Sequence, residues 1–167
     1  MAKGRPPEPI FDPEQPGPLV QAAIHVDDRG RIQLPQKIIG PLDWIKRTTT
    51  TEALAVLISP GLIRLHSWQD AAPAILERRR QLIQQAAHEP NATDMLRSLE
   101  DRYKRFQIPL GARPTLTFEM ILHLGISPFA PTSIYVWRVE TVIELNSVSY
   151  RREQLRVSWE DLEDRPQ

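Results

Sequence analysis

The chain has 167 residues, enough for one compact domain or for two small halves that share a core. It contains no cysteine, which excludes disulfides, thiolate zinc sites and cysteine nucleophiles, and no apolar run approaches the roughly 20 residues of a membrane span. The formal net charge is +0, which argues against a surface that is basic all round. Residues 21–68 carry six Lys or Arg against four Asp or Glu, whereas residues 106–150 carry two against three. A basic patch is therefore expected in the first part of the chain.

Residues 1–20 contain six prolines and little apolar material, which predicts a disordered or extended tail. Residues 21–69 are predicted to form a hairpin, a short helix and a second hairpin. The helix needs only residues 36–39, because Pro35 suits its start and Gly40-Pro41 ends it. The second hairpin joins a short, almost entirely apolar run at 53–58 to a partly alternating run at 62–66.

The first hairpin, residues 25–34, turns through a charged tip. Gly30 supplies the positive φ that such a turn needs, and Arg29 and Arg31 flank it. Asp27 lies four residues before Arg31, where its carboxylate could hold the guanidinium through a bidentate pair. Two arginines on a stiff turn can grip phosphates or base edges, or they can be ordinary solvated turn charges.

Residues 70–105 are predicted to form two helices joined at a short break, with Thr93 as the cap of the second helix. Each helix carries its apolar residues on one face. These residues are Ile75, Leu76, Leu82, Ile83 and Ala86 in the first helix, and Met95, Leu96, Leu99, Tyr103 and Phe106 in the second. Since such stripes exceed what one edge of the fold can cover, they predict a homo-oligomer.

Residues 106–149 then repeat the first pattern. Residues 111–117 match residues 29–35 at a spacing of 82, and Thr117 and Gly125 are placed to cap a helix between them. Repetition of this kind indicates two half-domains that complete one core, with residues 150–167 as a C-terminal tail. The expected fold is mixed α+β and β-rich: a pseudo-symmetric β-barrel made from two half-repeats, with the two-helix insertion outside it.

A strand, an Asp-x-x-Gly-Arg turn, a strand ending in Leu-Pro, a short helix and a closing hairpin resemble the AbrB-type swapped-hairpin domain. Two such units in one chain, with helices between, resemble the MraZ family of bacterial transcriptional regulators. In that family each half carries an Asp-x-x-x-Arg motif, which Asp27 and Arg31 satisfy in the first half. The second half departs from it: Pro109 stands in place of the Asp, and Ala112 in place of the glycine, although Arg113 is retained.

The resemblance implies a swapped-hairpin barrel and a sequence-specific DNA-binding regulator that assembles into homo-oligomers on promoter repeats of double-stranded DNA. It implies a cytoplasmic, nucleoid-associated protein. The residues that it assigns to DNA, together with the basic residues nearby, are Arg29, Arg31, Lys37, Lys46, Arg47 and Arg113, with Asp27 and Gly30 as supports of the turn. The alternative is a protein-interaction or assembly module that keeps the same barrel and does not bind DNA.

The sequence offers little for catalysis. It contains no glycine-rich phosphate loop, nucleophile elbow or His-Glu-x-x-His helix, and its four histidines lie singly. Asp27 and Asp28 are neighbours on an extended chain, so they point to opposite faces and cannot share one proton-transfer site. We therefore expect no enzyme, no cofactor, no metal, no membrane partner and no small-molecule substrate.

Overall fold

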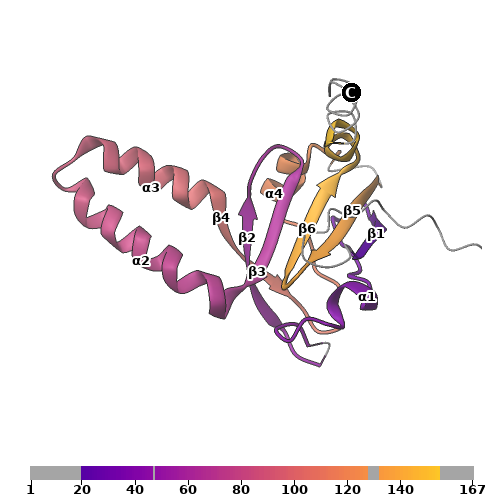
Figure 1. Cartoon of the computed structure of the whole chain (residues 1–167). Coiled ribbons are helices and arrows are strands. Elements are labelled where there is room, and N and C mark those ends of the chain that lie inside the picture. Colours follow the sequence, from indigo (N-terminus) through magenta and orange to yellow (C-terminus); the bar gives the residue numbers. More distant parts are fainter. Residues whose placement is uncertain (1–19, 47, 128–131, 155–167) are drawn as a thin grey trace, which may run out of the picture.

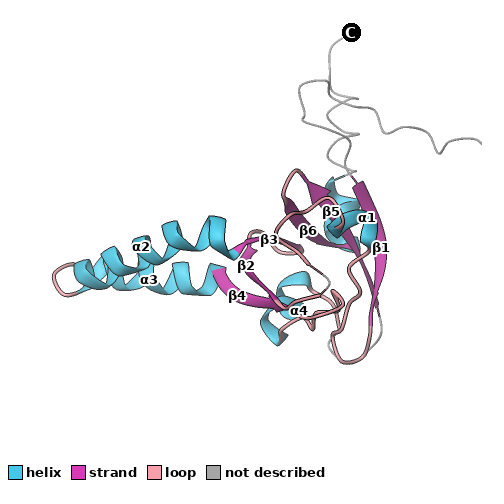
Figure 2. Cartoon of the chain, turned by 90° about the horizontal axis from the view of Figure 1, so that it is seen from below, coloured by secondary structure: helices cyan, strands magenta, loops and turns pink. Residues whose placement is uncertain are grey.

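The computed structural model describes residues 20–154 except residue 47 and residues 128–131 (Figure 1). The fold is mixed α/β, with one six-stranded antiparallel sheet in the order β1-β5-β6-β3-β2-β4 (Figures 1 and 2). The strands are β1 (Val20–Val26), β2 (Thr51–Leu57), β3 (Leu62–Ser67), β4 (Tyr103–Ile108), β5 (Thr132–Val139) and β6 (Val142–Ser147). The helices are α1 (Gln36–Ile39), α2 (Trp68–Ala86), α3 (Pro90–Arg102) and α4 (Phe118–Leu124), and residues 148–154 are also helical. None of the helices in the described part of the chain has the length and apolarity to cross a bilayer.

The sheet has an internal two-fold pseudo-symmetry. Its strand order is unchanged when β1 is exchanged with β4, β2 with β5, and β3 with β6. The registers follow the same exchange: Ile24 of β1 faces Ile134 of β5, as Phe106 of β4 faces Ala53 of β2. The first strand of each half therefore pairs with the second strand of the other half. The predicted repetition of one unit corresponds to two interleaved halves, not to two separate domains.

The halves also cross in the middle of the fold. The Ile32 amide donates to the Pro114 carbonyl at 3.0 Å, and the Leu34 amide donates to the Ala112 carbonyl at 3.0 Å. Ile32 and Pro114 are the two matched positions of the 82-residue spacing, so the pseudo-symmetry axis passes between them. The sequence prediction that residues 32–34 pair back onto residues 25–26 is wrong. The reason is burial: Ile32 and Leu34 are 1% and 0% exposed in the centre of the core, where the other half supplies the partners for their backbone donors.

The expected closure of the sheet into a barrel is not seen, because β1 and β4 are its two edges.

Strand β4 was not predicted from the sequence. Residues 103–106 continue the helical stripe of Leu99, but α3 ends at Arg102 and the chain becomes a strand with Phe106 and Ile108 buried and Gln107 exposed. This alternation of buried and exposed residues is the two-residue period of a half-buried strand. At the other end α3 begins at Pro90, three residues before the expected Thr93 cap, because proline needs no amide partner in a first turn.

Helices α2 and α3 form a hairpin that projects away from the sheet (Figure 1). Leu82 and Ala92 are buried between them, and Arg79 and Glu100 make an ion pair across them at 3.0 Å. The remaining apolar stripe is uncovered in the single chain: its exposed large side chains are Leu76, Ile83 and Met95.

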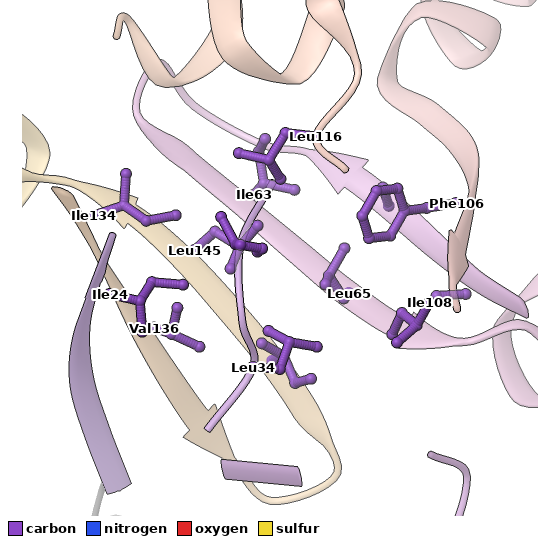
Figure 3. Packing of buried hydrophobic residues seen from close by; sticks show 14 of the residues in the cluster. Ile24, Leu34, Ile63, Leu65, Phe106, Ile108, Leu116, Ile134, Val136 and Leu145 are labelled. Carbon is purple, nitrogen blue, oxygen red and sulfur yellow. The ribbon is translucent and has the colours of Figure 1, made fainter. Parts of the chain in front are cut away.

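One core holds the two halves together. All six strands contribute to it, and the crossing segments add Ile32, Leu34 and Leu116. Figure 3 shows Leu34 and Leu116 among strand side chains of both halves. Apolar burial in this shared core is therefore the main term that joins the halves.

We predict that Leu34→Ala destabilises the whole fold by about 2–5 kcal/mol, because Leu34 is 0% exposed and its removal leaves a cavity between the halves. Denaturant unfolding followed by circular dichroism measures the change. The control is Leu110→Ala, at a side chain that is 63% exposed, where a change within about 0.5 kcal/mol is expected. A single transition is expected for both variants; two separate transitions would contradict a shared core.

Candidate nucleic-acid interface

The charged turn of the first half is built around the carboxylate of Asp27. Its Oδ1 accepts the backbone amides of Arg29 at 2.9 Å and Arg31 at 2.8 Å. Its Oδ2 accepts the Arg31 Nε at 2.7 Å. Gly30 closes the turn with φ of +78°, and a Cβ at this position would meet the Ile121 side chain at 3.0 Å. The tight turn at Gly30, with Asp27 in contact with Arg31, therefore agrees with the sequence prediction.

These bonds stabilise the ionised form of Asp27. The backbone amide of Arg31 is the largest cause, and the Arg31 side chain and the Arg29 amide add to it; together they outweigh desolvation and lower the pKa of Asp27 to about 2. The brace on Arg31 differs from the bidentate pair expected from the sequence, since one carboxylate oxygen is used by backbone amides. Arg31 is consequently held at Nε, and its two terminal amino groups make no other hydrogen bond within the described chain.

The second half keeps the same backbone turn without the carboxylate. The Ala112 amide donates to the Pro109 carbonyl at 3.0 Å, as the Gly30 amide donates to the Asp27 carbonyl at 3.0 Å. Ala112 takes the position of Gly30 and adopts φ of +57°, a left-handed conformation that is unfavourable for alanine. Because Pro109 has no carboxylate, Arg113 lacks the brace that Arg31 has.

The pseudo-symmetry brings the two arginines to one surface. Arg31 is bridged to Thr115, and Arg113 lies opposite Gln33 in the same antiparallel crossing. These four side chains alternate with buried neighbours, so they form the outer face of the crossing. Arg31 and Arg113 are diagonal neighbours there, which corresponds to a Cα separation of about 7–8 Å in a regular antiparallel pair. We call Arg31, Gln33, Arg113 and Thr115 the crossing face.

Gln33 supports this face from the first half. Its amide nitrogen donates to the carbonyls of Gly111 at 3.1 Å and Ala112 at 3.2 Å. This side chain ties the first half to the second turn. Gln33 and Thr115 were missed from the sequence, although the 82-residue spacing could have suggested them once the halves were known to cross.

The other residues that were predicted to bind DNA do not belong to the crossing face. Arg29 is exposed on the turn beside Arg31, and Lys37 is exposed on α1. Lys46 is exposed after Trp44, whose Nε1 donates to the Thr141 carbonyl at 2.8 Å. Thr141 lies beyond the end of β5 that is remote from the charged turn, since β1 runs into the turn opposite Thr132 at the start of β5. Lys46 is therefore not brought to the crossing face, and Arg47 lies outside the described residues.

We predict that Asp27 makes stability depend on acid pH. Its folded-state pKa is lowered to about 2 from an ordinary value of 3.8, so its contribution is complete above about pH 4 and is lost as pH falls through 2. Asp27→Asn should remove this part of the pH dependence and leave the dependence above pH 5 unchanged. Urea unfolding at a series of pH values measures it, with carboxyl-carbon NMR of Asp27 as the direct titration. An Asp27 resonance that titrates near 3.8 would contradict the brace.

No protein-family model matches the chain, and no curated protein matches it either. Function is therefore inferred from the residues of the crossing face and from the pseudo-symmetry that brings them together.

Proposed function

We propose that this chain is a sequence-specific DNA-binding regulator of the AbrB/MraZ kind, with a swapped-hairpin barrel as its fold type. The observation that carries the proposal is the crossing face: two arginines from equivalent turns lie on one exposed surface, and one of them is held by a carboxylate. The exchange of first strands between the halves supports the fold type. The sheet of the single chain is open, and its closure into a barrel is part of this proposal.

The two arginines differ in how firmly their guanidinium groups are held. A guanidinium that is free to move can neutralise a phosphate, but reading a base edge requires a side chain held in one geometry. Arg31 is fixed at Nε by Asp27 and keeps its terminal amino groups for a ligand. Arg113 is exposed and unbraced, which suits a phosphate contact. The first half is therefore the base reader in this proposal, and the second half contributes mainly to electrostatic affinity.

The test begins with selection of a preferred duplex from genomic fragments at near-physiological salt. On that duplex Arg31→Ala should cost about 1–3 kcal/mol for each base edge that it no longer reads and should abolish the preference over random DNA. Arg113→Ala should weaken specific and random DNA about equally and should make the salt dependence shallower by about one phosphate contact. Arg97→Ala, at an exposed position of α3 away from the crossing face, is the matched control and should bind as the parent does.

Two outcomes count against this proposal. Equal losses of preference from Arg31→Ala and Arg113→Ala would mean that the halves read DNA equivalently. Binding to neither selected nor random DNA, with the fold intact, would favour the alternative of an interaction or assembly module.

One observation favours the interaction or assembly module. The second half exposes Leu110, Phe118 and Leu122, which are 63%, 61% and 56% exposed. At the 82-residue spacing the first half has Asp28, Gln36 and Gly40 in these places. One face of the fold is thus polar in one half and apolar in the other, and exposed apolar clusters commonly mark protein contacts.

We further propose a homo-oligomer formed through the uncovered stripe of the helical hairpin. Replacing Leu76 and Ile83, which are 51% and 45% exposed, by glutamine should shift the oligomer to monomer because the polar side chains oppose burial of this stripe between copies. Light scattering at micromolar concentration measures the mass. Arg97→Gln, at an exposed charged position of α3, is the control and should keep the parent mass. A parent protein that is monomeric at this concentration would reject the homo-oligomer.

A further inference from the structure

A cavity of about 380 Å³ lies where the helical hairpin joins the sheet. Its floor is the outer face of β4, β2 and β3, where Val56 stands between Tyr103 and Arg64, and the neighbouring row pairs Leu54 with His66. Its other walls come from the helices: α2 contributes its first two turns and α3 its last residue. A volume in this range suits a small organic ligand.

The second half shows why the cavity exists. The position equivalent to Val56 is Trp137, because Trp137 faces Glu144 on β6 as Val56 faces Arg64 on β3. Trp137 is 6% exposed. Arg151 lies over its ring at 4.1 Å from the centroid. In the first half the residue that corresponds to Arg151 is Ala71, four residues after the end of β3. The equivalent space is thus filled in one half by two large side chains and left open in the other by two small ones.

The walls of the open cavity combine apolar and cationic groups. Leu54, Val56 and Ile75 give an apolar interior. Arg64 and Arg102 bring positive charge, and no acidic residue of the described chain lines the space. Arg64 is paired through Nε with Glu144 at 2.7 Å, which leaves its terminal amino groups for another acceptor. Arg102, at the exposed end of α3, has no ion-pair partner among the described residues.

We propose that this cavity binds a small organic anion with an apolar body and a single carboxylate. The apolar body rests on Leu54, Val56 and Ile75, and the carboxylate meets Arg102 and the free amino groups of Arg64. Charge complementarity selects the anion over a neutral ligand of the same shape, because two guanidinium groups and no carboxylate line the cavity. This site is separate from the crossing face and independent of the proposed DNA binding.

His66 offers an internal reporter of the bound charge. It is half-buried at the cavity wall, and burial together with the nearby Arg64 lowers its pKa. A carboxylate in the cavity would favour the protonated imidazole and raise that pKa. Imidazole NMR of His66 therefore distinguishes binding in the cavity from binding elsewhere on the surface.

The test uses benzoate, with benzamide as its neutral counterpart, in amide NMR titrations of the full chain. Benzoate should produce saturable shifts in β2, β3 and the start of α2, with a dissociation constant on the order of 1 mM for so small a ligand. Benzamide should bind at least about tenfold more weakly, because it lacks the charge that the arginines recognise. The pKa of His66 should rise with benzoate and stay unchanged with benzamide.

Two variants separate the cavity from its charge. Val56→Trp introduces the residue that the second half uses at the equivalent position, and it should abolish binding of both probes by filling the space. Arg102→Gln lies at an exposed helix end, leaves the core intact, and should reduce benzoate binding about tenfold without affecting benzamide. Arg97→Gln, one helical turn and a half away on α3, is the matched charge control and should bind benzoate as the parent does.

Benzoate shifts that are absent up to 20-fold above the expected dissociation constant, on the order of 20 mM, would overturn the proposal. So would shifts that persist unchanged in Arg102→Gln, since the anion would then bind elsewhere. If Val56→Trp does not fold, Arg102→Gln and the His66 titration still decide the question. Equal affinity for benzoate and benzamide would also reject an anion site.

Discussion

The fold depends on the crossing of its two halves at the pseudo-symmetry axis. The amides of Ile32 and Leu34 have carbonyl partners only in the second half, at Pro114 and Ala112. In the same way β1 has no strand partner in its own half and pairs with β5. A buried amide without a partner costs about 1–3 kcal/mol, so a half on its own would lose hydrogen bonds as well as core packing. The two halves therefore have to fold as one cooperative unit, and this unit is what carries both arginines to one face.

The two halves carry different residues at positions that the axis makes equivalent. Arg64 and Glu144 face each other across β3 and β6 at equivalent positions and form an ion pair at 2.7 Å. Two identical halves would place like charges there, which is unfavourable for directly opposed residues. A single chain with two different halves can use opposite charges instead. The same freedom allows a braced turn at Asp27 in one half and Pro109 in the other.

Much of this organisation could be predicted from the sequence because it is local or repeated. Thr117 accepts the Met120 amide and Gly125 ends α4 with φ of +68°, as expected from cap chemistry. The turn at Gly30 and the Asp27 brace follow from residue types at fixed spacing.

The pairing of residues 32–34 could not be predicted in this way, since local alternation suits a hairpin and a crossing equally. The missed strand β4 has the same cause: Tyr103 and Phe106 fit a helical stripe as well as a strand, and only the partner strand β2 decides. The cavity beside Val56 depends on helices and strands that meet only in the folded chain.

The net charge of the chain does not describe the local charge at its surface. Six carboxylates of the described chain are used in ion pairs, and each pair cancels charge where it lies. The pairs are Asp27–Arg31, Arg64–Glu144, Arg79–Glu100, Arg80–Glu77, Lys104–Glu119 and Arg105–Glu52. In the two turns and in α1, Arg29, Lys37 and Arg113 form no such pair, and neither does the exposed Asp28. Three unpaired cations thus stand against one unpaired carboxylate there, so a chain with a formal charge of +0 retains local positive charge at the place where the halves meet.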